Sequence, residues 1–161
     1  MRITAMFRYP VKSMLGEPID ESELDERGLA GDRSYAIVDR ETGFVASAKH
    51  PRKWQRLLEC SARYLSPPRA GAPLPPVLIR LPDGTTVESG TPDVDRTLST
   101  FLGRDVALVT SITHAPMREA DRRSVDAAEE LVKEEPLAVG APAGTFFDHA
   151  PIHVIATSTV E

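Results

Sequence analysis

FRYPVKS, residues 7–13, and GLAGDR, residues 28–33, are the two stretches from which the fold and the site can be deduced. Each stretch places a compact polar group beside residues that turn the chain: Lys12 and Ser13 in the first, Arg33 in the second. Turns expose backbone N–H groups, and an ammonium with a guanidinium adds directional donors that suit a phosphate. A solvated Lys12 and a turn-forming Ser13 explain the same residues, so residue chemistry alone leaves both interpretations open.

Composition indicates an ordinary globular protein. The chain has 161 residues, of which 41% are hydrophobic and 27% charged, a balance unlike that of disordered segments. Its 19 Lys and Arg against 24 Asp and Glu give a net charge of −5, which argues against general nucleic-acid binding. The sequence has no signal-peptide pattern and no apolar run of about 18 residues. We therefore expect no membrane association and a cytoplasmic location.

The first hundred residues alternate β-branched or aromatic runs with turn signals, which favours a mainly β fold with minor α content. Asp83-Gly84 predicts a tight hairpin turn. A short helix is expected over residues 91–103, capped by Thr91 and ended by Gly103. The candidate strands are 2–9, 34–39, 44–46, 57–64, 77–81, 85–89, 106–110 and a last one at 152–155.

Residues 114–142 are strongly polar, and we expect them to form a connector with a turn or two of helix over 125–133. No internal repeat is evident. The connector separates the β-rich first part of the chain from a final segment in which apolar residues alternate again.

Several other polar residues favour structural roles. Asp32 is expected to pair with an arginine or to cap the glycine-rich turn, and His50 to be structural or exposed because it precedes a proline. Cys60 is expected to be a buried, inert thiol on a strand face shared with Leu58 and Ala62. His149 and His153 are four residues apart with a proline between them, so they cannot share a helical face as the ligands of HExxH-type metal sites do.

Four segments together carry a family resemblance: RYPVKS at 8–13, ERGLAGDRSYAIVD at 26–39, FVASAKHP at 44–51 and GTFFDHAPIHVIATSTV at 144–160. The first three resemble the N-terminal β-barrel domain of MOSC proteins, the molybdenum cofactor sulfurase C-terminal superfamily, and the last resembles the start of the MOSC domain itself. The resemblance implies an N-terminal barrel domain at 1–113, the connector at 114–142 and the incomplete start of a MOSC domain, with its first strand, at 143–161. Where the family often has arginine this chain has Lys49, so a bidentate contact is reduced to a point charge.

The resemblance also implies a function. In cofactor-binding members such as the mitochondrial amidoxime-reducing component, residues of these motifs contact the molybdenum cofactor, a molybdopterin. The matching positions here are Lys12, Ser13, Arg33, Thr157 and Ser158. The family's molybdenum-ligating cysteine lies beyond position 161, so we expect no catalytic residue and no metal ligand in this chain, which would then be an inactive fragment.

The intact protein would be an oxidoreductase that reduces N-hydroxylated substrates, with a ferredoxin-like or flavoprotein electron donor, or a sulfur-handling protein that acts as a sulfur carrier. The alternative is a non-catalytic module that binds a pterin phosphate or another phosphorylated ligand.

Overall fold

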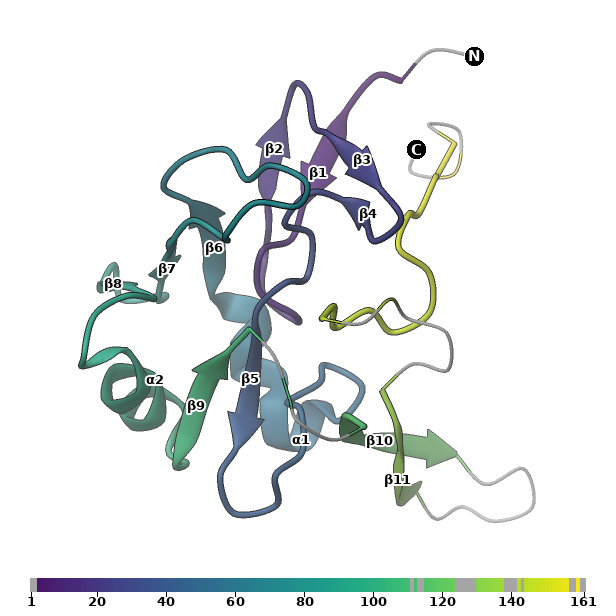
Figure 1. The fold of residues 1–161 in the computed structure, drawn as a ribbon. Coiled ribbons are helices and arrows are strands. Elements are labelled where there is room, and N and C mark those ends of the chain that lie inside the picture. The colour runs from purple at the N-terminus through teal and green to yellow at the C-terminus, as the bar shows by residue number, and fades with distance from the viewer. Residues whose placement is uncertain are drawn as a thin grey trace.

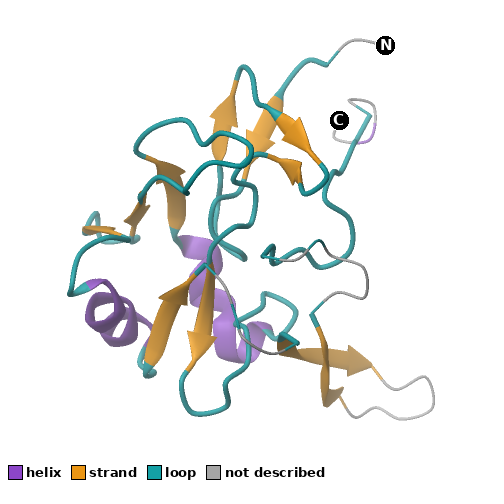
Figure 2. Cartoon of the chain, in the orientation of Figure 1, coloured by secondary structure: helices purple, strands orange, loops and turns teal. Residues whose placement is uncertain are grey.

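The structure is a computed structural model that describes residues 3–110, 112, 115–123, 130–137, 142, 144–156 and 159. It is mainly β, with two short α-helices (Figures 1 and 2). None of the helices in the described ranges is long and apolar enough to cross a membrane. The elements are β1 Met6–Arg8, β2 Glu17–Ile19, β3 Leu24–Asp25, β4 Gly28–Leu29, β5 Ala36–Asp39, α1 Pro51–Trp54, the 3-10 helix Gln55–Glu59, β6 Ser61–Tyr64, β7 Val77–Arg80, β8 Thr86–Glu88, α2 Val94–Leu102, β9 Val106–Val109, β10 Met117–Arg123 and β11 Glu130–Pro136.

The main core lies between the antiparallel β5–β9 pair, the β6–β7–β8 sheet and the two α-helices. α2 contributes Val94 and Leu98, which are buried, and ends as predicted at Gly103, whose φ of 67° is left-handed. The hairpin predicted at Asp83-Gly84 is confirmed, because β7 and β8 pair in register on either side of it. The small pairs β1–β2 and β3–β4 lie at the other end of the molecule in Figure 2.

β5 is covered on both faces, which explains its continuous apolar sequence. Ile37 points into the main core. Ala36 packs on the other side in a second cluster with Val45, Leu137 and Phe146. This second cluster therefore anchors residues from the C-terminal part of the chain against the N-terminal sheet.

β10 and β11 form an antiparallel hairpin within the segment expected to be a polar connector. The expected helix over 125–133 is wrong in its last part, since Glu130–Pro136 is a strand. Backbone bonds join β10 to the loop after β5: the Val45 amide donates to the Met117 carbonyl at 2.8 Å, and the Asp121 amide to the Lys49 carbonyl at 2.7 Å. These two bonds hold the β10–β11 hairpin against residues 45–49.

Other expectations need correction. Thr91 does not cap α2, because its hydroxyl donates to the Glu88 carbonyl and Asp93 occupies the cap position. Residues 44–46 form only a single bridge, Val38 with Val45, and residues 57–59 lie in the 3-10 helix before β6 begins. Residues 152–156 form no strand, and Val154 is 79% exposed, because no described segment pairs with them.

Residues 144–151 cross the surface beside β3 and β4, and we call this segment the strap (Figure 1). The Arg27 guanidinium donates to the Gly144 carbonyl at 2.6 Å, and the Phe146 amide donates to the Arg33 carbonyl at 2.9 Å. Gly28 has a φ of 98°, and a Cβ there would lie 2.8 Å from the Pro151 Cβ, so only glycine allows this approach. The strap thus brings the far end of the chain onto the two N-terminal motifs.

Candidate anion-binding site

Lys12 is the most deeply buried charged group of the first motif. Its backbone amide donates to the Tyr35 carbonyl at 2.9 Å, which fixes the chain directly beside β5. Its side chain is only 2% exposed, and Nζ lies 2.6 Å from Oδ1 of Asp148 in the strap. Lysine is rarely buried to this degree unless it is paired. The interpretation of Lys12 as a solvated surface residue is therefore wrong.

A second cation reaches the same carboxylate from the β10–β11 hairpin. Arg118 is paired across the strands with Glu135, and its Nε and Nη2 donate to Glu135 Oε1 at 2.9 and 2.7 Å. The remaining Nη1 donates to Asp148 Oδ1. Glu135 thus orients the guanidinium, and a single carboxylate oxygen bridges Lys12 and Arg118.

The charges at this point perturb one another. Burial lowers the pKa of Lys12 to about 8; the Asp148 carboxylate opposes that change, while Arg118 and Arg33 add to it. Burial would raise the pKa of Asp148, but the positive charges of Lys12, Arg118 and Lys49 outweigh it and hold that pKa below its usual range. Four cations therefore act on this carboxylate or on its lysine partner.

Arg33 stands at the rim of this cluster with a strained backbone. Its φ of 46° is left-handed, which is uncommon for a residue other than glycine, and its amide donates to the Tyr9 carbonyl at 2.7 Å. The guanidinium lies over the rings of Tyr9 and Phe147, with its Cζ 4.8 and 5.5 Å from their centroids, and pairs with Asp32. The Asp32 carboxylate also accepts a hydrogen bond from the Tyr9 amide, so its predicted pairing with an arginine is confirmed.

Ser13 also has a left-handed backbone, with a φ of 65°. Its Oγ accepts a hydrogen bond from the Ala48 amide at 3.0 Å, which ties the first motif to the loop that carries Lys49. The hydroxyl proton of Ser13 is not used in that bond. Ser13 can therefore still donate to a bound group.

The structure thus brings together Lys12 and Arg33, and it adds Arg118 and Asp148. Arg118 was missed because it lies in a polar stretch with no recognisable pattern, and Asp148 was included only as part of the segment 144–160 that resembles the start of a MOSC domain. Thr157 and Ser158, the other two expected contacts, lie outside the described residues.

The donor set has a clear chemical preference. Lys12, Arg118 and Arg33 supply an ammonium and two guanidinium groups, and such groups form strong charge-assisted bonds with multiply charged oxyanions. The cluster therefore fits the phosphate end of a molybdopterin.

The described residues include no ligand suited to the metal end. Cys60, the single cysteine of the sequence, has 0% exposure, and burial raises its pKa to about 11. Cys60 is buried, as predicted. It follows the 3-10 helix, however, and does not share a strand face with Leu58, which lies in that helix and is exposed. A thiol in this state does not fit a metal-ligating role.

The histidines have different environments. His50 is buried, and its Nδ1 pairs with Asp121 on β10, so its structural role is confirmed. His149 and His153 are exposed. Among the residues that the structure describes, no group of three His, Cys, Asp or Glu side chains is placed to hold a metal ion.

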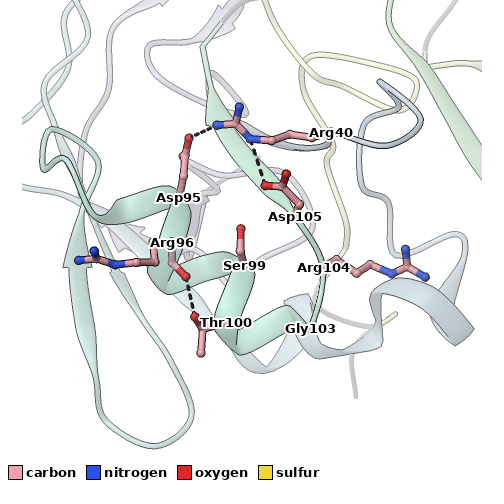
Figure 3. Close-up of a pocket in the computed structure, with 8 residues that line it drawn as sticks. All are labelled: Arg40, Asp95, Arg96, Ser99, Thr100, Gly103, Arg104 and Asp105. Atoms are coloured by element: carbon pink, nitrogen blue, oxygen red, sulfur yellow. Dashed lines mark hydrogen bonds and ion pairs between the residues drawn. The ribbon is translucent and has the colours of Figure 1, made fainter.

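A separate cavity of about 640 Å³ lies between α2 and the residues flanking β5 and β9 (Figure 3). Arg40 points toward Asp95 and Asp105, at 2.6 and 3.4 Å, so its charge is already compensated. Arg40 is half exposed, and exposed pairs of this kind contribute little. This cavity lacks the buried, convergent charge of the Lys12 cluster.

Comparison with known proteins gives one family. Residues 1–63 match the MOSC N-terminal beta barrel domain, a segment that includes Lys12, Ser13 and Arg33. No curated protein and no solved structure matches the chain. The predicted fold class, mainly β with minor α, is confirmed: the described chain is mainly β with two short α-helices, and residues 1–63 match the MOSC N-terminal barrel model.

Proposed function

We propose that this chain, whose first 63 residues match the MOSC N-terminal beta barrel domain, binds the phosphate end of the molybdenum cofactor through Lys12, Ser13 and Arg33. The observation that supports this proposal is a buried ammonium, Lys12, that shares one carboxylate oxygen with the Arg118 guanidinium and is close enough to Arg33 for that charge to lower its pKa. Thr157 and Ser158 belong to the proposal as further contacts. When bound, the cofactor supplies the redox or sulfur chemistry, and the chain contributes binding and orientation.

Each residue has a distinct part in this proposal. Lys12 supplies a point charge in a region with little water, where electrostatic attraction is strong. Arg33 supplies a planar donor that lies over the rings of Tyr9 and Phe147, and Ser13 donates its hydroxyl proton. The Asp32 carboxylate pairs with Arg33 and holds it in place, because Asp32 is itself fixed by a hydrogen bond from the Tyr9 amide.

The proposed activity of the whole protein is reduction of N-hydroxylated substrates, with electrons from a ferredoxin-like or flavoprotein partner, or sulfur transfer on the cofactor. The resemblance of the four motifs to MOSC proteins supports this part.

The second candidate is a binding module without turnover, specific for a pterin phosphate or another phosphate monoester. It is favoured by the donor set of the described residues, in which Lys12, Arg33 and Arg118 suit an oxyanion and the single cysteine of the sequence, Cys60, is buried with a raised pKa.

The test uses the full chain purified from a host that makes the cofactor. Molybdenum content and the fluorescence of oxidised pterin are measured for the wild type and for Lys12→Ala combined with Arg33→Ala. The control combines Arg40→Ala with Arg69→Ala, which removes two exposed positive charges outside the cluster.

Cofactor in the wild type and the control, but not in the Lys12 and Arg33 variant, is the expected result. Binding of a phosphate monoester without co-purified pterin, lost in the same variant, would favour the second candidate. Equal binding of cofactor and monoester by all three proteins, or binding by none, would refute both.

A further inference from the structure

Asp148 occupies the place where the cationic groups of the site converge. Its Oδ1 receives both the Lys12 ammonium and Nη1 of Arg118, and no other carboxylate of the described residues contacts both cations. A carboxylate oxygen and a phosphate oxygen accept the same charge-assisted bonds. The position of Asp148 therefore marks where an oxyanion of a ligand would sit.

The local charge count fits a multiply charged anion. Lys12, Arg33, Lys49 and Arg118 are cations, and Asp32, Glu135 and Asp148 are the carboxylates paired with them or acting on them. Arg122 shares Glu135 and adds a fifth positive charge. Without Asp148 five positive charges face two negative ones, and this excess favours a multiply charged anion such as a phosphate monoester.

Arg118 is held so that one donor stays directed at this place. Glu135 takes its Nε and Nη2, and Arg122 in turn donates to the other Glu135 oxygen at 2.6 Å. The guanidinium is 5% exposed, so its direction is fixed by burial as well as by pairing. Removal of Asp148 would leave Nη1 of Arg118 aimed at the vacated position beside Lys12.

Asp148 can also leave more easily than the cations can. Its side chain is 37% exposed, against 2% for Lys12 and 5% for Arg118, and it lies in the strap and not in a paired strand. Partly exposed side chains outside ladder hydrogen bonds move at the lowest free-energy cost. Phe146 and Phe147 anchor the strap in the core, so the exchange of Asp148 for a ligand would move the Asp148 side chain and the residues after it, and would leave both cations where they are.

We propose that Arg118 is an additional anion-binding residue, and that the Asp148 carboxylate is an internal competitor which a phosphate group must displace to reach Arg118 and Lys12. This inference rests on the proposed function, because it concerns the same phosphate position. It adds a residue from the β10–β11 hairpin and a competing group from the strap.

The experiment measures binding of inorganic phosphate and of a phosphate monoester to the full chain by calorimetry. Asp148→Asn keeps the shape of the side chain and removes its charge, so affinity should rise about tenfold, the effect of one charge-assisted bond. Arg118→Met should lower affinity by a similar factor, and Arg118→Lys should restore part of it. The matched control is Glu119→Gln. Glu119 is a partly buried carboxylate on β10, the strand of Arg118, but it pairs with Lys53 and not with Lys12 or Arg118.

Hydrogen exchange of the wild-type strap gives a second readout that does not depend on a variant folding. Phosphate should increase exchange at the amides of residues 148–150, because Asp148 is released, whereas a ligand that merely tightens the fold would decrease it. Increased exchange, together with the affinity changes above, supports the proposal.

Two results would overturn the proposal that phosphate displaces Asp148, and only the second would also overturn the proposed function. Phosphate binding that depends on Lys12 but is unchanged or weaker in Asp148→Asn would make Asp148 a purely structural partner, and the proposed function would stand. No phosphate binding by the wild type or by Asp148→Asn would refute both.

Discussion

Replacement of Lys12 by methionine should remove a pH-dependent penalty from the folded state. The pKa of Lys12 falls from 10.5 to about 8 because burial outweighs its pairing with Asp148. At about 1.4 kcal/mol per pKa unit, the fold disfavours the charged ammonium by about 3 kcal/mol at pH 7. Methionine has similar length and no charge, so Lys12→Met should be more stable than the wild type at pH 7 by up to about 3 kcal/mol. The gain is reduced by the cost of leaving the Asp148 carboxylate without its lysine partner.

The pH dependence separates this effect from packing. Between pH 8 and 10.5 the unfolded chain keeps the Lys12 proton and the folded chain has lost it, so wild-type stability should rise with pH. The difference between Lys12→Met and the wild type should therefore shrink by about 3 kcal/mol over that window. The raised pKa values of Cys60 and Tyr64 act in the opposite direction, but equally in both proteins, and they cancel in the difference.

The assay is urea unfolding at pH 7.5 to 10.5, followed by the fluorescence of the buried Trp54 and by circular dichroism. Lys53→Met is the control of opposite sign: burial lowers the pKa of Lys53, but bonds to Glu119 and Asp39 outweigh this and leave it raised. That variant should lose stability by a constant amount over most of this range, because a lysine with a raised pKa contributes fully below the unfolded value of 10.5 and loses that contribution only at higher pH. Parallel curves for Lys12→Met and the wild type would refute the reasoning.

Three further outcomes are expected. Ser13→Ala should destabilise the fold more than Ser13→Gly by about 1 kcal/mol, since both lose the bond from Ala48 but only glycine relieves the positive φ; equal losses in urea unfolding would contradict this. Gly28→Ala should cost more than about 1 kcal/mol and speed proteolysis within the strap, because its Cβ would meet Pro151, and unchanged cleavage would count against the close approach. The Cys60 thiol should react with a disulfide reagent at pH 8 only at the rate of unfolding, and fast reaction in the native protein would show that it is accessible.

The sequence predicted the parts of the fold that depend on local cues. The β7–β8 hairpin follows from Asp83-Gly84, and the end of α2 follows from Gly103, because each requires a positive φ that glycine supplies. The residues Lys12 and Arg33 were recognised from short motifs. That they lie in one place could not be derived, since it depends on the bonds that the first motif makes to Tyr35 and Arg33 across the fold.

The β10–β11 hairpin was missed because its sequence has no apolar alternation. MREADRR and ELVKEEP have charges on both faces, and their register instead shows cross-strand pairing such as Arg118 with Glu135. A rule based on a two-residue apolar period cannot detect such a strand. Because the hairpin was not predicted, the position of Arg118 beside Lys12 and Asp148 was not predicted either.

The separation of Lys12 and Asp148 by 136 residues has a consequence for biosynthesis. A ribosome adds about 5–20 residues per second, so Lys12 is made roughly seven to twenty-seven seconds before its partner. Throughout that interval Lys12 is without its carboxylate partner. A phosphate-bearing ligand that arrives during translation would meet no competitor, whereas one that arrives after release must displace Asp148, so the moment of encounter would decide how readily the site is filled.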